Sequence, residues 1–332
     1  MKFLAYLLKD FEKLELSSIE KAPKEGEILV KVKAALTCGT DTKMYKRGHP
    51  KFPFPSLFGH EASGVIAEKG KGVGSLKEGD EVIFPISSPC LSCKFCNKGL
   101  ESQCENLFDE WVWGAFAEYI LIPKRIVQNS TYIKPKNITF EEGALLDPFA
   151  SVIFSQNFFK DLNAKVLIIG AGPMGFLQAI YSSLRGFDVT VCDINKERLE
   201  IFKSLNFKVL ISEQRMVNEF EKYDFIIECS GTSAGFEIAL KFIDKGGKIC
   251  LFAGMPKNFF ISFDGAHLHY NQNTIYGSFH YDRKAVFEAY NLLFEKSLNL
   301  KPIFSGYYSL KEFPKALEKV LKGEGLKYVI LP

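Results

Sequence analysis

The sequence predicts an α/β protein made of a β-rich part and a second part with a doubly wound parallel sheet. Two observations support this fold class. In the first 148 residues, short apolar or alternating runs are separated by many glycines, which is typical of short strands joined by tight turns. After about residue 150, near-continuous apolar runs alternate with helix-length segments, as in a parallel sheet covered by helices on both faces.

The β-rich part contains four strand predictions, each bounded by glycine, proline or charge. They cover residues 27–34, 63–68, 80–84 and 116–122. The last fifty residues return to a mixed pattern, with helices predicted at 284–294 and 310–321 and a strand at 327–331. We expect residues 1–149 and 280–332 to form one domain and residues 150–279 to form the other.

The second domain contains six strand predictions. They cover residues 165–170, 188–193, 208–211, 223–230, 248–253 and 274–279. The helices predicted between them cover residues 173–184, 196–205, a short segment near Val217, and residues 234–242. Six strands alternating with helices fit a dinucleotide-binding sheet.

Composition and charge exclude several classes of protein. A chain of 332 residues with 47% hydrophobic content suits a globular protein of two domains. A formal net charge of +3 is too small to indicate nucleic acid or an anionic membrane surface as a partner. No apolar stretch reaches the ~18 residues that span a bilayer, and the apolar run near Met1 is shorter than a signal-peptide core. We expect a cytoplasmic protein with reduced thiols.

Four of the eight cysteines fall in one short run, with the spacing Cys90-x2-Cys93-x2-Cys96-x7-Cys104. Four thiolates this close can bind one tetrahedral Zn²⁺. The alternative is two disulfides in a secreted protein, and nothing else in the chain looks secreted. The sequence therefore predicts a structural-zinc lobe over residues 88–106.

A glycine-rich turn follows the first strand of the second domain and opens the next helix. It consists of Gly170, Ala171, Gly172, Pro173, Met174 and Gly175. The first glycine makes the turn, the second lets the backbone approach a pyrophosphate, and the third lets helix and strand pack closely. The helix N-terminus then directs its unpaired N–H groups toward the phosphates.

An acidic residue stands at the distance from this turn that ribose recognition requires. Asp193 ends the second strand, where a carboxylate accepts hydrogen bonds from the adenosine ribose and repels a 2′-phosphate. NAD is therefore predicted as the cofactor in preference to NADP. Arg198 follows one helical turn later, where it lies either beside the ribose or in solvent.

A second metal site is indicated by Cys38, at the end of a predicted strand, and His60, at the start of another. A thiolate and an imidazole from separate strands can share one Zn²⁺ and leave room for a carboxylate and a substrate. A metal-bound histidine usually donates its other N–H to a carboxylate, and Asp41 is the candidate for that role.

Together these stretches resemble the zinc-dependent medium-chain dehydrogenase/reductase family, which includes alcohol, sorbitol and threonine dehydrogenases. The matching stretches are residues 38–41, 59–61, 143–148, 170–175 and 193–195 and the four-cysteine lobe. The resemblance covers nearly the whole chain. It implies a GroES-like catalytic domain joined to a Rossmann NAD-binding domain, in a homodimer or homotetramer.

The resemblance also implies two zinc ions per subunit. Cys38 and His60 would bind the catalytic zinc, with Glu61 as the third ligand or as a nearby carboxylate that exchanges with water. Asp147 falls where many alcohol dehydrogenases carry a cysteine ligand and polyol or threonine dehydrogenases carry a glutamate. Because aspartate is one methylene shorter than glutamate, its direct ligation stays open. Thr40 would hydrogen-bond the substrate oxygen and pass its proton toward the nicotinamide ribose.

One position departs from the family pattern. The family often carries a histidine where this chain has Lys43, as the outer member of a proton relay. An ordinary lysine, with a pKa of ~10.4, is a poor relay near neutral pH. Either the site lowers the pKa of Lys43, or the proton leaves through the ribose and water. Lys43 could also bind an anionic group or stand in solvent.

The expected function is hydride transfer between NAD(H) and the CH–OH or C=O group of a polyol or related secondary alcohol. Within the same family, a sugar phosphate, an amino-cyclitol or threonine are alternative substrates. An alternative of another class is a non-catalytic protein that binds NAD and zinc.

Overall fold

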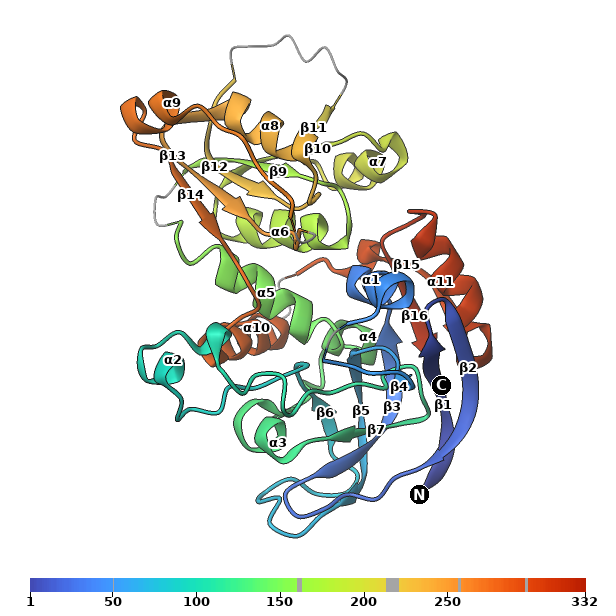
Figure 1. Ribbon diagram of the computed structural model, residues 1–332. Helices are drawn as coiled ribbons and strands as arrows, with labels where there is room; N and C mark the ends of the chain where they lie inside the picture. Colours follow the sequence, from blue (N-terminus) through green and yellow to red (C-terminus); the bar gives the residue numbers. More distant parts are fainter. Residues whose placement is uncertain (50, 160–162, 213–220, 256–257, 296–297) are drawn as a thin grey trace. The chain divides into compact units, whose positions relative to one another are not determined.

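The computed structural model describes residues 1–49, 51–159, 163–212, 221–255, 258–295 and 298–332. This part of the chain forms two compact units (Figure 1). The first unit comprises Met1–Ala150 and Tyr281–Pro332, and the second comprises Ser151–His280. Among the described residues, no helix is both long and apolar enough to cross a membrane.

A mostly antiparallel sheet forms the centre of the first unit. Within the described ranges its strands follow the order β15-β16-β3-β5-β6-β8, and β7 pairs with β3. A smaller sheet has the order β2-β1-β4. The strands are β1 (Lys2–Asp10), β2 (Lys13–Glu20), β3 (Ile28–Leu36), β4 (Ser56–Leu57), β5 (Glu61–Lys69), β6 (Glu81–Ile83), β7 (Tyr119–Ile122), β8 (Tyr132–Ile133), β15 (Phe304–Ser309) and β16 (Lys327–Leu331).

Short helices connect these strands. They are α1 (Gly39–Arg47), α2 (Lys94–Asn97), α3 (Lys124–Ser130), α4 (Phe140–Gly143), α10 (Arg283–Glu295) and α11 (Phe313–Leu321), with 3₁₀ turns η1 (Glu101–Gln103), η2 (Lys301–Ile303) and η3 (Leu310–Glu312). One further helix, α5 (Leu146–Ser155), contains the boundary between the two units.

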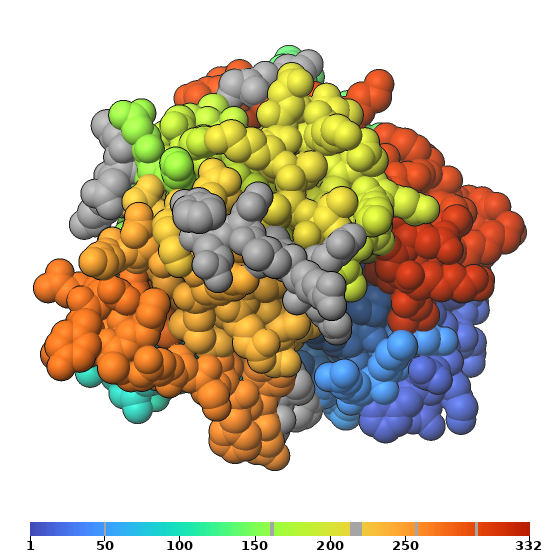
Figure 2. Space-filling view, turned by 90° about the horizontal axis from the view of Figure 1, so that it is seen from above, coloured from blue at the N-terminus to red at the C-terminus, as the bar shows by residue number. Residues whose placement is uncertain are grey.

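The second unit is a parallel sheet of order β11-β10-β9-β12-β13-β14, as far as the structure describes it. Its strands are β9 (Lys165–Ile169), β10 (Asp188–Asp193), β11 (Lys208–Ile211), β12 (Tyr223–Glu228), β13 (Ile243–Leu251) and β14 (Thr274–Gly277). Its helices are α6 (Pro173–Leu184), α7 (Lys196–Ser204), α8 (Ser233–Phe242) and α9 (Gly265–Tyr270). Helices α6 and α8 lie on opposite faces of the sheet (Figure 1), and α7 and α9 lie at opposite margins of the face in Figure 2.

The predicted fold class is confirmed, and most predicted elements are present. The strand order places the crevice of a doubly wound sheet outside the carboxyl ends of β9 and β12, where such sheets bind ligands. The predicted short helix near Val217 lies outside the described residues.

Several local predictions were incomplete, and β4, β8, β15, α3 and α5 were not predicted. The antiparallel pair β1–β2 was not predicted, because the burial pattern of β1 does not alternate regularly between its two faces. The strand expected to end at Cys38 ends instead at Leu36, and Cys38 is the N-cap residue of α1. A thiol accepts hydrogen bonds only weakly, so cysteine is a poor signal for a helix start.

Candidate metal centres and nucleotide turn

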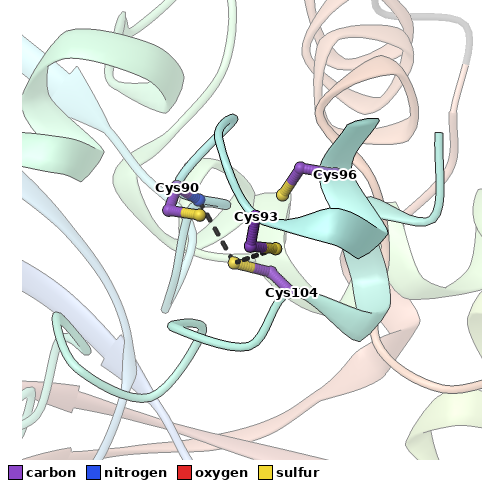
Figure 3. Close-up of side chains that lie close together, drawn as sticks. All are labelled: Cys90, Cys93, Cys96 and Cys104. Atoms are coloured by element: carbon purple, nitrogen blue, oxygen red, sulfur yellow. Dashed lines mark hydrogen bonds between the residues drawn. The ribbon is translucent and has the colours of Figure 1, made fainter. Parts of the chain in front are cut away.

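The four cysteines of the lobe face a common centre (Figure 3). Their sulfur atoms all lie within 4.8 Å of one another, and the Cys93 and Cys104 sulfurs are 4.0 Å apart. Sulfurs at the corners of a tetrahedron with Zn–S bonds of ~2.3 Å are about 3.8 Å apart. All eight cysteines are free thiols in the structure. The lobe fits a structural zinc ion.

Hydrogen bonds to the sulfur atoms favour the thiolate form of some cysteines in this lobe, and thiolates bind cations. Burial acts to raise the pKa of Cys90, but hydrogen bonds from Ser92 and the Cys93 backbone outweigh it and lower that pKa to about 5. Hydrogen bonds from the backbone of Cys96 likewise lower the pKa of Cys93. Burial raises the pKa of Cys96 to about 12. Part of the lobe is thus ionised before a metal binds, since a metal ligates the thiolate.

The second cluster is assembled by the pairing of β3 with β5. Leu36, the last residue of β3, lies opposite Glu61, the first residue of β5. Cys38 follows Leu36 in the chain, and His60 precedes Glu61. The antiparallel register therefore brings Cys38 and His60 together. The ligand atoms of Cys38, His60 and Glu61 all lie within 4.8 Å of one another.

Gly59 allows the backbone to turn sharply just before His60. Its φ is +87°, and a Cβ there would lie 2.6 Å from the ring of Phe116. That ring stacks on Phe313 in the phenylalanine-rich core of the first unit. Any other residue at position 59 would displace this core and move His60.

Asp41 orients both the thiol and the imidazole. One of its carboxylate oxygens accepts a hydrogen bond from the Cys38 backbone N–H at 2.9 Å, and the other lies 3.0 Å from Nδ1 of His60. The expected contact between Asp41 and His60 is therefore present. It leaves Nε2 of His60 as the nitrogen for a metal.

A buried lysine, which the sequence did not reveal, holds Glu61. Lys327 is fully buried, and its Nζ donates to Oε2 of Glu61 at 2.5 Å and to the Thr37 carbonyl at 3.1 Å. Burial lowers the pKa of Lys327, but Glu61 outweighs this effect and raises it. Burial also raises the pKa of Glu61, against the opposing charge of Lys327. The one signal in the sequence for this buried lysine is its position at the start of an otherwise apolar strand.

Asp147 lies outside the cluster of three ligands in the described part of the chain. Its Oδ1 accepts hydrogen bonds from the Ile86 backbone N–H at 2.7 Å and from the Tyr281 hydroxyl at 2.5 Å. Burial and the Asp147 carboxylate raise the pKa of Tyr281 well above its ordinary value, so the phenol keeps its proton. Tyr281 was not among the predicted site residues.

Thr40 and Lys43 both stand on α1, the helix that Cys38 caps, and both are exposed. Thr40 lies in the first turn of the helix and Lys43 in the second. The helix connects Cys38 to Thr40, for which the resemblance implies proton transfer, and to Lys43, for which several roles were left open.

Both tryptophans of the chain belong to an aromatic cluster beside His60. The Trp113 ring lies 5.0 Å from the His60 ring, and Trp111 stacks on Phe108 at 4.4 Å. Phe52 contacts both tryptophans. Trp113 is buried, and its Nε1 has no hydrogen-bond partner among the described residues, whereas Phe52, Phe108 and Trp111 are half-buried. The cluster is a group of apolar rings beside His60.

The glycine-rich turn of the second unit has the geometry predicted for it. Gly170 has a φ of +112°, and a Cβ on Gly175 would lie 1.8 Å from the Gly170 carbonyl oxygen. At Gly172 the nearest atom to such a Cβ is Nη1 of Arg198, at 3.8 Å. Gly172 therefore leaves space where a pyrophosphate approaches, and α6 begins directly after it at Pro173.

Asp193 is held at the end of β10 by backbone donors. Its two oxygens accept from the N–H groups of Ala171, at 2.5 Å, and Asn195, at 2.8 Å. The carboxylate thus stands beside the glycine-rich turn, as ribose recognition requires. Glu228, at the end of β12, is a buried carboxylate near this turn that the sequence did not reveal, and it accepts from the Gly231 N–H.

Two family models match the chain. The alcohol dehydrogenase GroES-like domain matches residues 24–131, and the zinc-binding dehydrogenase model matches residues 173–296. L-threonine 3-dehydrogenase from Coxiella burnetii is 30% identical over 328 residues, covering 93% of each chain. The enzyme of that name from Idiomarina loihiensis is 28% identical over 331 residues, covering 95% of each chain.

Solved structures share the fold. Benzyl alcohol dehydrogenase from Acinetobacter calcoaceticus matches with a TM-score of 0.88 at 23% identity, covering 100% of this chain and 99% of that one. An alcohol dehydrogenase from Escherichia coli CFT073, complexed with NADH, matches with a TM-score of 0.89 at 21% identity and the same coverage.

Proposed function

Because the chain belongs to the zinc-dependent medium-chain dehydrogenase family, we propose that it transfers hydride between NAD(H) and the CH–OH or C=O group of a secondary alcohol. The observation that carries this proposal is the convergence of Cys38, His60 and Glu61. A thiolate, an imidazole and a carboxylate form a ligand set that suits catalytic Zn²⁺ and leaves a position for substrate.

Bound Zn²⁺ would supply a Lewis acid that makes an alcohol hydroxyl more acidic. Residues of the protein would orient the ligands and carry the proton away. Asp41 holds His60 in the tautomer that presents Nε2. Thr40 places a hydroxyl next to Cys38, where it can accept a hydrogen bond from the substrate alcohol and take its proton onward.

NAD is the cofactor we propose for the second unit. Gly170, Gly172 and the N-terminus of α6 would hold the pyrophosphate. Asp193 would accept from the ribose hydroxyls and disfavour the 2′-phosphate of NADP. Arg198, whose Nη1 approaches the turn at Gly172, would contact the pyrophosphate side of the cofactor.

The finer proposal is a polyol or related secondary alcohol as substrate. It is supported by the candidate ligand set. That set contains one cysteine and a glutamate, and it resembles the arrangement in the polyol branch of the family. L-threonine is an alternative, because the curated relatives carry that name. A sugar phosphate or amino-cyclitol is a further alternative, in which Lys43 would bind the anionic group.

The aromatic cluster favours a second candidate within the same reaction, an alcohol with an apolar ring next to the carbinol carbon. Phe52 and Trp111 are half-buried, and aromatic rings attract flat apolar groups. Trp113 connects this surface to His60.

The test is a screen for NAD⁺ reduction with four substrate groups: polyols, their phosphates, L-threonine, and aryl alcohols such as 1-phenylethanol. We expect turnover in at least one group and its loss when the catalytic zinc alone is removed. If two bound zinc ions and bound NAD are measured but no group is oxidised, the non-catalytic alternative is supported instead. A Lys43→Ala variant that loses activity only with anionic substrates would identify the phosphate group.

A further inference from the structure

The second unit contains a cavity between α8, β13 and α9, with a volume of about 340 Å³. Helices α8 and α9 lie on the same side of the sheet (Figure 1). Among the described residues, most of the cavity lining is apolar, from Leu240, Ile243, Ile249, Phe263 and Leu268. Proteins hold small molecules in cavities of about 300 Å³ and more, and a dry cavity of about 150 Å³ holds benzene. This cavity therefore has room for two fused rings.

The cavity lies toward the edge of the sheet opposite to the nucleotide turn. Ile243 is the first residue of β13, and Asn273, another lining residue, directly precedes β14. The strands are parallel, so their amino ends share this edge. Gly170 and Asp193 lie at the carboxyl ends of β9 and β10, at the other edge. The cavity is thus distinct from the proposed cofactor site.

Two polar residues of the lining contain a buried atom without a hydrogen-bond partner among the described residues. These atoms are Nε2 of His267 and Oδ1 of Asn273. A buried polar atom that has no partner is costly, and in folded proteins such atoms are nearly always satisfied by protein, water or ligand. A molecule in the cavity can supply the missing partner.

The wall that contains these atoms is held in place by the protein itself. Nδ2 of Asn273 donates to the carbonyls of Asp244, at 2.6 Å, and Gly247, at 3.4 Å. These bonds fix the amide so that Oδ1 is the atom left over, and a carbonyl oxygen only accepts. At the start of α9, Asp264 accepts from the Ala266 N–H at 2.9 Å. The site is therefore preformed and requires a hydrogen-bond donor from its ligand.

The charged residues of the lining favour a neutral ligand, because Lys241 and Asp264 have opposite charges. We propose that the cavity binds a neutral molecule of two fused rings that carries one O–H or N–H group, and that this group donates to Oδ1 of Asn273. The apolar walls would take the rings. This binding site is separate from hydride transfer and does not depend on it.

Calorimetric titration with 2-naphthol tests the proposal, since this probe has two fused rings and one hydroxyl. We expect about one 2-naphthol per chain, with a dissociation constant below about 1 mM. Saturation with NAD⁺ should leave this affinity unchanged. Naphthalene, which has no donor, should bind about 3- to 10-fold more weakly, the usual effect of losing one hydrogen bond.

Variants that fill the cavity place the probe in it. Leu240→Trp and Leu268→Trp add bulk from the α8 wall and the α9 wall, and each should weaken 2-naphthol binding at least about tenfold. Leu184→Trp is the matched control, because Leu184 is exposed at the end of α6 and does not line the cavity. It should bind 2-naphthol as the wild-type chain does. Circular dichroism checks that each variant is folded.

Four results would overturn the proposal. The first is a wild-type chain that does not bind 2-naphthol up to the solubility limit of the probe. The second is an affinity that a folded filling variant leaves unchanged. The third is displacement of the probe by NAD⁺, which would place it in the cofactor site. The fourth is naphthalene binding as tightly as 2-naphthol, which would remove the hydrogen bond to Asn273 and the ligand class inferred from it.

Discussion

The two metal clusters of the first unit are built in opposite ways. The lobe takes all its ligands from Cys90 to Cys104, and its further contacts to sulfur come from neighbouring backbone and side chains. The second cluster takes Cys38 and His60 from the ends of two paired strands. Its supporting lysine, Lys327, lies 266 positions away from Glu61 in the sequence.

This difference separates a local site from an assembled one. The lobe's geometry depends mainly on its own loop, so changes within it affect stability first. The assembled site depends on strand register, a buried ion pair and residues from both ends of the chain. Changes there should alter the chemistry first, and the predictions below set one region against the other.

The largest difference should come from removing one ligand of each cluster. We expect Cys38→Ser to lower turnover by at least ~10³-fold, because metal polarisation contributes several kcal/mol to such reactions. It should retain one zinc ion per chain by elemental analysis. Cys96→Ser should lose the lobe zinc and unfold at lower urea concentration, while molecules that remain folded keep turnover. Equal losses of turnover in the two variants would remove the distinction between the clusters.

The buried pair Glu61–Lys327 should be nearly as sensitive. Lys327→Met leaves the Glu61 carboxylate buried without its cation, which costs about 3–5 kcal/mol for pairs of this kind. The free energy of unfolding in urea measures the effect. Lys208→Met is the control, because Lys208 and Asp188 form an ion pair at 2.5 Å on the surface, where such pairs contribute about 0–1 kcal/mol. Similar losses in both variants would contradict the prediction.

Metal binding at the assembled site should depend on pH. Burial acts to lower the pKa of His60, but the Asp41 carboxylate outweighs it and raises that pKa well above 6.5. His60 is then protonated near neutral pH in the metal-free chain, and a metal must displace the proton. Apparent affinity should therefore rise with pH, by up to about tenfold per unit below the raised pKa.

Calorimetry in two buffers of different ionisation enthalpy measures the protons released on metal binding. Asp41→Asn should lower the pKa of His60 and reduce this release. An affinity that does not change with pH, or proton release that Asp41→Asn leaves unaltered, would refute the assignment.

The smallest effect should come from the contact that anchors the lobe. The Arg283 guanidinium, at the start of α10, donates to Oε1 of Glu101 in η1 at 2.9 Å and 3.2 Å and to Oε2 at 3.3 Å. Because Arg283 is partly exposed, we expect Arg283→Ala to cost only about 1 kcal/mol of stability. Zinc content should not change, since no lobe ligand is touched. Loss of the lobe zinc in this variant would show that the lobe needs more than its own loop.

The site residues that the sequence predicts most directly are those whose expected role depends on near neighbours. The cysteine lobe, the glycine-rich turn and Asp193 each carry their signal in spacing within one segment. The parallel sheet was predicted for a similar reason, because its strands are buried on both faces and appear as continuous apolar runs. The pair β1–β2 was not predicted although its strands are neighbours in the chain, because β1 does not alternate regularly between buried and exposed residues.

The sequence by itself predicted the fold class, the four-cysteine lobe, the glycine-rich turn and Cys38 with His60 as candidate ligands. Only the tertiary structure showed that Lys327 neutralises Glu61 and that Tyr281 and Ile86 hold Asp147. The physical reason is that a buried charge or hydroxyl acquires its role from whichever group the fold brings within hydrogen-bond distance. That group lies at no fixed separation along the chain, so no spacing in the sequence can indicate it.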